Sequence, residues 1–438
     1  MSCDSNNATE PSPGIAPGSD TIDPRRVAEM LARAPGGGIP EHIRRLMPAF
    51  DAPFYQAGLA GYSDPAMRII ARRHGCPMCV TEALLDRTLL AGGRGFAKAD
   101  LGDLHDNIPG GHEDHPLVGQ IMGSDPREMA AAALKMLEQR ARSDSEYRRL
   151  AYADGVTPPG PLRLPGGEQI RATTDDSPTD APAMPPGVSM RGGFEGIDVN
   201  LACPVKKIEK KARGGHWLSE PEGAIEILQA VREVVPKDVA CSVKLRRSFD
   251  ETPEMVESLD TILDATRAMG YDWATVHART VVQKYVGPSR WDLLRDLVAR
   301  HPDMTIFGSG DIWNAADIFR MIAYTGVKAV SVARGCIGNP WIFRQARDLM
   351  AGRDPAPPTL EEQRQVLEAH FVLLMAVCGS MRQPEEMASR HIRKFGIRFS
   401  AHHPDAERVR RRVIEVQTHA HWTALLDECY ATPEIARG

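Results

Sequence analysis

Short apolar runs alternate with longer stretches of helical spacing along most of this chain, and this alternation limits the possible folds more than any other feature. The apolar runs are Phe54–Ala57, Cys79–Ala83, Leu117–Met122, Gly196–Leu201, Ala240–Arg246, Trp273–Arg279, Met304–Gly310 and Ala329–Arg334. Such runs between helices are typical of parallel strands, which are buried on both faces. Eight of them predict a closed (β/α)8 TIM barrel, and a doubly wound open sheet is the alternative.

Three parts of the chain lack this alternation. Residues 1–48 begin with Ser, Asn, Pro and Gly and contain one short helical stretch, so we expect a largely disordered N-terminal leader. Residues 143–191 are rich in Pro, Gly and Asp and are interpreted as an insertion within the barrel domain, residues 49–350. Residues 351–438 show helical spacing with few β-branched runs and predict a C-terminal helical domain.

The composition restricts the classes of function. Lys and Arg number 53 against 58 acidic residues, so the net charge of −5 gives no global attraction to nucleic acid. Eight scattered cysteines are too few for a secreted disulfide framework, and the N-terminus lacks the features of a signal peptide. No apolar run approaches the ~18 residues that span a bilayer. We therefore expect a cytoplasmic protein with no membrane association.

Polar side chains recur on one face of several predicted strands, because successive side chains point to opposite faces. These residues are Asp198 and Asn200; Ser242, Lys244 and Arg246; and Thr275, His277 and Arg279, joined by Gln120 and Asp311. One such residue alone could simply reach solvent at a strand end. Repetition over five strands predicts a polar pocket at the carboxyl ends of the strands, where the active sites of barrels lie.

The last two predicted strands end in glycine-containing segments. Gly308-Ser309-Gly310-Asp311 closes the seventh run, and Ala333-Arg334-Gly335 closes the eighth. Glycine lets backbone N–H groups approach a ligand closely, and barrels commonly bind phosphate after strands seven and eight. The paired position of these segments indicates a phosphate site, although glycine after a strand is also ordinary turn chemistry.

Two groups of cysteines differ in what they suggest. Cys203 lies just past the fourth predicted strand, where it can act as a proton donor or a nucleophile; the alternative is a small buried apolar residue. Cys76 and Cys79 form a lone Cys-x-x-Cys without a second pair or nearby His ligands. We interpret them as core thiols, and we expect no metal site.

Several segments together resemble the dihydrouridine synthase family, which are flavin-dependent enzymes that reduce uridine in tRNA. The resemblance covers about residues 54–430 and is interrupted by the insertion. Its strongest segments are GIDVNLACPVKKIEKKARGGHWL, SVKLR, TVHARTVVQKYVG and GSGDIWNAADIFRMIAYTGVKAVSVARGCIGNPWIF.

The resemblance implies FMN across the barrel mouth, with NADPH or NADH as the electron donor. The cofactor-binding residues that it implies are Gly58, Leu59 and Ala60 at the isoalloxazine, Gln120, Lys244 and His277 hydrogen-bonding the flavin, and Ser309, Gly310, Asp311, Ala333 and Arg334 at the ribityl and phosphate groups. Reduced flavin would deliver a hydride to C6 of uracil while Cys203 protonates C5. Asn200 and Arg279 are the residues expected to orient the base.

The resemblance also implies tRNA as the partner, and no obligate protein partner is inferred. Basic residues cluster after the candidate cysteine and in the C-terminal domain: Lys206, Lys207, Lys210, Lys211 and Arg213, then Arg390, Arg393, Lys394, Arg398, Arg408, Arg410, Arg411 and Arg412. A charge run is often only a solvated helix face, whereas two such runs favour an RNA surface. Two alternatives remain: an FMN barrel oxidoreductase for a small molecule, and a catalytically inactive RNA-binding relative.

Overall fold

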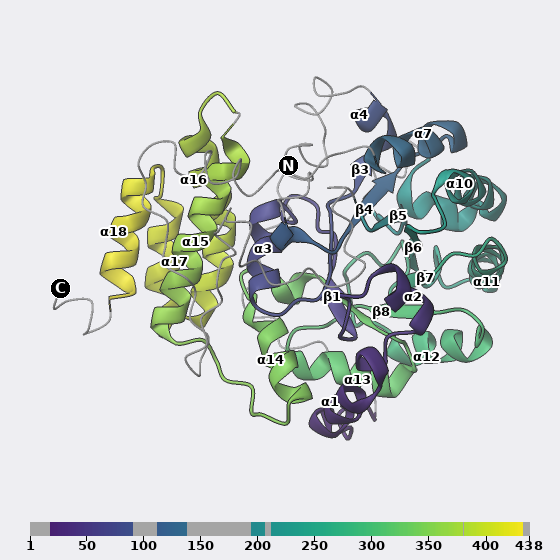
Figure 1. The fold of residues 1–438 in the computed structure, drawn as a ribbon, viewed down its shortest axis with the longest axis horizontal. Helices are drawn as coiled ribbons and strands as arrows, with labels where there is room; N and C mark the ends of the chain where they lie inside the picture. Colours follow the sequence, from purple (N-terminus) through teal and green to yellow (C-terminus); the bar gives the residue numbers. More distant parts are fainter. Residues whose placement is uncertain (1–17, 91–111, 138–193, 206–211, 380, 432–438) are drawn as a thin grey trace, which may run out of the picture.

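The chain forms a barrel flanked on one side by a bundle of helices (Figure 1). The structure is a computed structural model that describes residues 18–90, 112–137, 194–205, 212–379 and 381–431. The predicted insertion at 143–191 lies outside these residues. Within the described ranges, no helix is both long and apolar enough to cross a bilayer.

The barrel is built from eight parallel strands, as the sequence predicts. The strands are β1 (Phe54–Gln56), β2 (Cys79–Val80), β4 (Leu117–Met122), β5 (Gly196–Leu201), β6 (Ala240–Arg246), β7 (Trp273–His277), β8 (Ile306–Ser309) and β9 (Val330–Val332). Strand β1 pairs with β2 and with β9, and β2 pairs with β4, so the sheet closes on itself. The short strand β3 (Leu84–Leu85) adds to β4 beyond the end of β2.

Helices cover the outside of the barrel and bury the apolar face of each strand. In β5, Ile197, Val199 and Leu201 are at most 1 % exposed. The barrel helices are α3 (Pro65–Arg73), α4 (Asp86–Leu90), α7 (Pro126–Leu137), α10 (Pro221–Val234), α11 (Pro253–Ala268), α12 (Trp291–Arg300), α13 (Ala315–Thr325) and α14 (Trp341–Met350). Four of these begin with proline, whose fixed φ suits the first helical position. The alternate strand residues are thereby left to fill the interior.

The N-terminal segment differs from the expected disordered leader. Residues 1–17 lie outside the described part, but the chain then forms α1 (Pro24–Arg33), a 3-10 turn (Pro35–Gly38) and α2 (Glu41–Leu46). Apolar residues of this segment cluster with residues from the amino ends of the strands; the cluster includes Ile39, Ile43, Met47, Phe50, Trp273 and Phe307. The Pro- and Gly-rich composition suggested a mobile tail. Instead, the apolar side chains of Ile39, Ile43, Met47 and Phe50 cover the end of the barrel at which the strands begin.

The C-terminal helices form a separate layer beside the barrel. They are α15 (Leu360–Cys378), α16 (Pro384–Phe399), α17 (Ala406–Ile414) and α18 (His419–Cys429), and they stand together at one side of the barrel, green to yellow in Figure 1. Helix α15 packs against α3, so the bundle contacts the barrel near the loop that follows β1. The helical domain predicted for the C-terminal part is therefore present, and it lies next to the mouth.

Candidate active site

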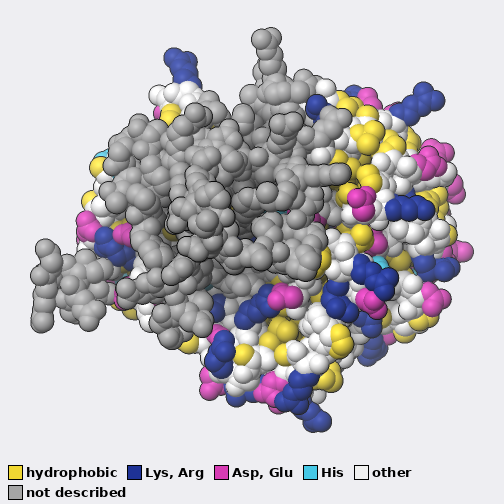
Figure 2. Space-filling model, in the orientation of Figure 1, with side chains coloured by type: hydrophobic (Ala, Val, Ile, Leu, Met, Phe, Trp, Pro, Cys, Tyr) yellow, Lys and Arg dark blue, Asp and Glu magenta, His cyan; other side chains and the backbone are white. Residues whose placement is uncertain are grey.

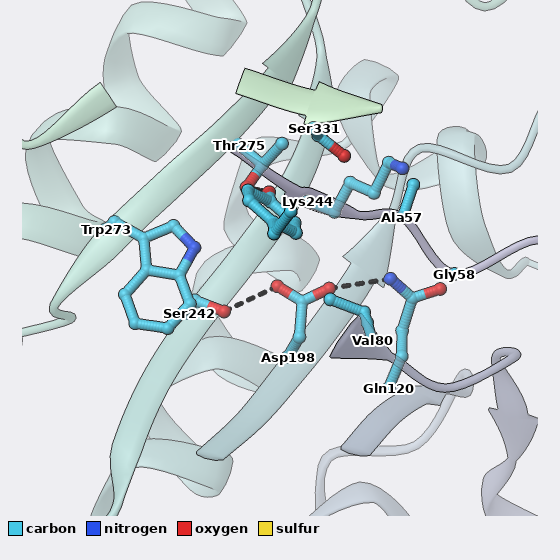
Figure 3. A pocket seen from close by; sticks show the side chains of 11 residues that line it. Ala57, Gly58, Val80, Gln120, Asp198, Ser242, Lys244, Trp273, Thr275 and Ser331 are labelled. Carbon is cyan, nitrogen blue, oxygen red and sulfur yellow. Dashed lines mark hydrogen bonds between the residues drawn. The ribbon is translucent and has the colours of Figure 1, made fainter. Parts of the chain in front are cut away.

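A small cavity lies inside the barrel, and polar side chains from several strands point into it (Figure 3). Its lining residues are Tyr55, Ala57, Gly58, Val80, Gln120, Asp198, Ser242, Lys244, Trp273, Thr275 and Ser331. Three of the sequence-predicted cofactor residues, Gly58, Gln120 and Lys244, are therefore brought to one place.

A chain of hydrogen bonds crosses three neighbouring strands. Asn200 Nδ2 donates to Gln120 Oε1 at 2.7 Å, and Gln120 Nε2 donates to Asp198 Oδ2 at 2.7 Å (Figure 3 shows the second bond). Ser242 Oγ donates to the other oxygen of Asp198 at 2.6 Å. The backbone N–H of Ala202 donates to Asn200 Oδ1 at 2.9 Å. That bond fixes which end of each amide is the donor along the chain.

This network leaves Gln120 with one amide hydrogen that no described residue accepts. Its Nε2 carries two hydrogens and only one is donated to Asp198. The predicted role of Gln120 as a hydrogen-bond donor to a ligand is thus compatible with its structural role. Asn200 is bonded at both ends, to Gln120 and to Ala202, and so organises the strand ends; its Nδ2 likewise keeps one hydrogen that no described residue accepts.

Lys244 brings a cation into the barrel interior, and its side chain extends toward Ala57 in Figure 3. Burial lowers the pKa of its ammonium group, and the nearby Asp198 carboxylate opposes that shift. Burial in turn raises the pKa of Asp198. A buried charge is costly unless an anion or a polar ligand compensates it. Lys244 therefore favours a polar or anionic ligand in the cavity.

His277 ends β7 next to the cations of β6. Burial lowers the pKa of His277 well below its usual value, and the positive charges of Arg246 and Lys244 add to this effect. The imidazole is therefore neutral at physiological pH. Its Nδ1 accepts the backbone N–H of Arg279 at 3.2 Å, which places the ring hydrogen on Nε2. His277 is thus a neutral hydrogen-bond donor at the barrel mouth.

Cys203 lies in the segment that follows β5, as expected from the sequence. Burial raises the pKa of its thiol, with Arg246 and Lys244 partly offsetting the shift, so the thiol is protonated at neutral pH. Its carbonyl oxygen accepts the N–H of Gly215 at 3.0 Å. A Cβ on Gly214, whose φ is +57°, would lie 2.8 Å from the Cβ of Cys203. Two glycines thus let the returning chain pass against the cysteine.

A buried ion pair holds this returning chain. Arg213, which directly precedes the two glycines, pairs with Asp86 at the start of α4, with Nη2 and Oδ1 3.2 Å apart. The same carboxylate accepts the backbone N–H groups of Arg87 and Ser124. Arg213 belongs to a basic run that was expected to face RNA, whereas in the structure its side chain is buried against Asp86. The partner Asp86 has no sequence signal of its own.

The segment after β8 is tied to the loop after β7. The Asp311 carboxylate, on a backbone with φ of +55°, accepts from Arg279 Nη2 at 2.8 and 2.7 Å and from the N–H of Ser289 at 2.7 Å. Arg334 Nη2 lies 3.4 Å from the same carboxylate. The neighbouring Ser309 hydroxyl is buried without a hydrogen-bond partner among the described residues.

Arg279 and Arg334 differ in their freedom to meet a ligand. Arg279 is 1 % exposed and also donates to the carbonyl of Gly287, so its guanidinium joins two loops. These contacts give Arg279 a positioning role, and the direct contact with a base that was expected from the sequence stays a prediction. Arg334 is half-exposed, and its guanidinium carbon lies 4.7 Å from the ring centre of Trp313 and 5.1 Å from that of Tyr285.

The loop after β1 contains the remaining predicted cofactor residues, Gly58, Leu59 and Ala60. A Cβ on Gly58 would lie 2.3 Å from the carbonyl oxygen of Thr81, so only glycine fits there. The Ser63 hydroxyl accepts the N–H of Leu59 at 2.8 Å. Ala60 is exposed. The last of the predicted cofactor residues, Ala333, directly follows β9, the strand that pairs with β1, and precedes a short 3-10 turn.

The other cysteine pair, Cys76 and Cys79, is buried, with the two Sγ atoms 4.0 Å apart. No group of three or more His, Cys, Asp or Glu side chains that could hold a metal occurs among the described residues.

The fold and the site define a (β/α)8-barrel protein with a polar ligand site at the carboxyl ends of its strands. A family model described as Dihydrouridine synthase (Dus) matches residues 187–433, more than half of the 438-residue chain. The chain therefore belongs to the dihydrouridine synthase family.

Similar curated proteins carry related descriptions. A "Probable tRNA-dihydrouridine synthase" of Mycobacterium tuberculosis (strain ATCC 25618 / H37Rv) is 32 % identical over 260 residues, which are 57 % of this chain and 64 % of that protein. A protein of Treponema pallidum (strain Nichols) with the same description is 32 % identical over 203 residues, covering 45 % and 58 %. The "tRNA-dihydrouridine synthase B" of Pseudomonas aeruginosa PAO1 is 27 % identical over 363 residues, covering 82 % and 87 %. The matched part spans less than two thirds of the first two relatives.

Proposed function

We propose that this protein reduces uridine to 5,6-dihydrouridine in tRNA, with FMN as its cofactor and NADPH or NADH as the electron donor. The observation that carries the proposal is the Cys203 thiol, which is held protonated beside a polar barrel mouth in a chain of this family. A thiol in that state is a proton donor rather than a nucleophile.

The residues at the mouth fit a flavin. A ring system with carbonyl oxygens needs hydrogen-bond donors, and Gln120 of β4, Lys244 of β6 and His277 of β7 each offer one. The Ser309 hydroxyl, buried and without a hydrogen-bond partner among the described residues, suits the hydroxyls or the phosphate of the ribityl chain of the flavin. At Gly310, φ is +120° and a Cβ would lie 2.1 Å from Ser289 Oγ, so only glycine fits. Its backbone can therefore come close to the phosphate-bearing chain of the flavin.

The protein's own groups then support the reduction. When bound, reduced FMN supplies a hydride to C6 of the uracil ring. Negative charge develops over C5, C4 and O4, and the Cys203 thiol gives its proton to C5. The sulfur becomes a thiolate, which the positive charges of Arg246 and Lys244 stabilise. Proton transfer from solvent would restore the thiol before the next turnover.

The nucleotide must leave its stack to reach this site, so the RNA needs a basic surface near the mouth. On the face in Figure 2, basic and acidic side chains are interspersed over the described part. In α17, Arg411 pairs with Glu407, and Arg408 and Arg412 pair with Glu428. Their charges are largely neutralised locally.

The cations of α16 are less engaged. Among the described residues, no ion-pair partner is found for Arg390, Arg393 or Arg398. We therefore propose that α16, rather than α17, provides the RNA contacts in the helical domain. The basic residues at 206–211 lie outside the described part of the chain.

The direct test measures dihydrouridine in cellular RNA with and without this protein, and after re-expression of Cys203→Ala. We expect loss of the modification without the protein and no restoration by the variant. Cys241→Ala is the matched control, since Cys241 is buried mid-strand and burial raises its pKa to about 12. Restoration by Cys203→Ala would refute the catalytic assignment.

The same protein preparations separate the two alternatives. Reduction of free uracil or of an enone at full rate, with no RNA-dependent activity, would identify a small-molecule oxidoreductase. Salt-sensitive tRNA binding by a protein that takes up no FMN would identify an inactive RNA-binding relative.

A further inference from the structure

One cation of the helical domain faces the barrel instead of the solvent. Lys394, on α16, donates through Nζ to the backbone carbonyl of Gly61 in the loop after β1. We propose that Lys394 is a positioning residue that ties the helical domain to the loop Gly58–Tyr62 and so holds the flavin-contacting loop in its binding conformation. This inference rests on the proposed flavin site.

Aromatic rings enclose the ammonium group of Lys394. Its Nζ lies 5.3 Å from the ring centre of Tyr62 and 5.5 Å from that of Phe395. The two rings pack edge to face with centres 5.5 Å apart. One ring belongs to the β1 loop and the other to α16, so the contact joins the two domains at a single cation.

The loop is held from the barrel side as well. The N–H of Gly61 donates to Glu82 Oε1 at 2.5 Å, and Glu82 is only 2 % exposed. The carbonyl of the same residue is bound by Lys394. Gly61 has φ of +71°, a conformation that side chains rarely adopt, and nothing lies within 4 Å of the place of a Cβ. On the side where a Cβ would stand, no described residue packs against Gly61, and polar contacts hold its N–H and its carbonyl.

Two histidines, His370 and His391, and the carboxyl group of Asp64 lie near Lys394. Burial lowers the pKa of His370 and of His391 to about 3, and the positive charge of Lys394 adds to both shifts. Burial raises the pKa of Asp64, and Lys394 opposes that shift. Both histidines are neutral at physiological pH, so neither can take the place of the lysine.

Holding the loop in advance removes an ordering cost from cofactor binding. Fixing the backbone of one residue costs about 1–2 kcal/mol, which corresponds to about a ten-fold change in an equilibrium constant. Without Lys394, the binding of FMN would itself have to order the loop, and the free energy of binding would be reduced by that cost. We therefore expect Lys394→Met, which keeps the aliphatic contacts with the rings but loses the donors, to raise the Kd for FMN about ten-fold.

The test uses the full-length protein stripped of flavin and titrated with FMN, with fluorescence as the readout. Arg393→Gln, one residue away on α16, is the matched control. We expect it to leave the FMN Kd unchanged and to reduce the salt dependence of tRNA binding by about one unit of slope. Lys394→Met should raise the FMN Kd and leave the salt dependence of tRNA binding unchanged. Lys394→Arg, which keeps a donor, should bind FMN with a Kd within about three-fold of the unsubstituted protein.

Equal FMN affinity in Lys394→Met and the unsubstituted protein would overturn the inference, as would a changed salt slope without a changed Kd. Should Lys394→Met fail to fold, Lys394→Gln gives the decision by the same titration: a shorter donor that cannot reach Gly61 must also weaken FMN binding. If the unsubstituted protein binds no FMN at all, the proposed function fails instead, so the two failures are distinguishable.

Discussion

The buried pair of Asp86 and Arg213 offers a sharp test of how the loop that returns to Cys203 is held. Both side chains are nearly inaccessible, at 0 % and 6 % exposure. The perturbations are Asp86→Asn, Arg213→Met and the double variant. Asp86→Asn removes the charge that faces the guanidinium, and Arg213→Met removes the cation while keeping a long apolar side chain in its place.

The two single variants should differ, because the partners left behind differ. With Arg213 removed, Asp86 keeps the N–H of Arg87 at 2.7 Å and that of Ser124 at 3.3 Å. With Asp86 neutral, Arg213 is left a buried cation whose Nε already has no hydrogen-bond partner among the described residues. We expect Asp86→Asn to cost about 3–5 kcal/mol of unfolding free energy and Arg213→Met about 1–3 kcal/mol.

Urea unfolding of the three variants measures these quantities. The double variant should be more stable than Asp86→Asn alone, because it contains no unpaired buried cation, and the coupling energy should be about 1–3 kcal/mol. Burial already raises the pKa of Asp86, and loss of Arg213 raises it further, so protonation favours the folded state. The deficit of Arg213→Met should therefore shrink as the pH falls from 7 toward 5. An Asp86→Asn cost below about 1 kcal/mol would refute the reasoning.

Three further changes test the site itself. Gly58→Ala places a Cβ 2.3 Å from the Thr81 carbonyl, and it should abolish FMN uptake, measured by absorbance of the purified protein. Because burial raises the pKa of Cys203, the proton-transfer rate should stay constant up to about pH 9 and fall above it; single-turnover kinetics would show this, and a fall near pH 7 would contradict it. Lys244→Met removes a cation that lowers the Cys203 pKa, so the fall of the proton-transfer rate at alkaline pH should move to higher pH.

The strands were predictable because burial leaves a local signature. Strands β4, β5 and β6 have the predicted bounds, since each is a continuous run flanked by clear breaks. The second predicted strand, Cys79–Ala83, instead ends at Val80, and the short strand Leu84–Leu85 follows beyond its predicted end. Between them, the side chains of Thr81 and Glu82 accept the N–H groups of Gln120 and Gly61. The N-terminal segment was misjudged from composition, because its role depends on the open end of a barrel that forms only after the distant strands have paired.

The polar face was predictable for the same reason. Gln120, Asn200 and Lys244 lie together because strand parity places them on one side, and that pattern is visible in the sequence. The hub of the network, Asp198, was placed in the predicted polar pocket by the same parity, but with no cofactor or substrate role of its own. Its importance follows from accepting bonds from two strands at once, which the alternation of residues along one strand cannot show.

The cations near the site show what sequence alone leaves open. Arg279, Lys394 and Arg213 were each read as a residue for substrate or RNA, because a cation beside a ligand site can act on either the ligand or the protein. In the structure each of them contacts a loop of the site, through the Asp311 carboxylate, the Gly61 carbonyl and the Asp86 carboxylate. These contacts hold the four loops at the mouth that follow β1, β5, β7 and β8.

Three of these loops carry a glycine with positive φ near the site, Gly61 after β1, Gly214 after β5 and Gly310 after β8. A Cβ at Gly214 or Gly310 would collide with Cys203 or Ser289, nothing lies within 4 Å of the place of a Cβ at Gly61, and glycine loses the most conformational freedom on folding. A loop that must bring its backbone close to a ligand therefore cannot also be fixed by bulky side chains at the same residues. The fixing groups have to reach in from elsewhere, and long cationic side chains meet that need because they can bind a carbonyl or carboxylate at a distance from their own backbone. Three cations that the sequence assigns to the substrate, Arg213, Arg279 and Lys394, thus bind loops of the site itself.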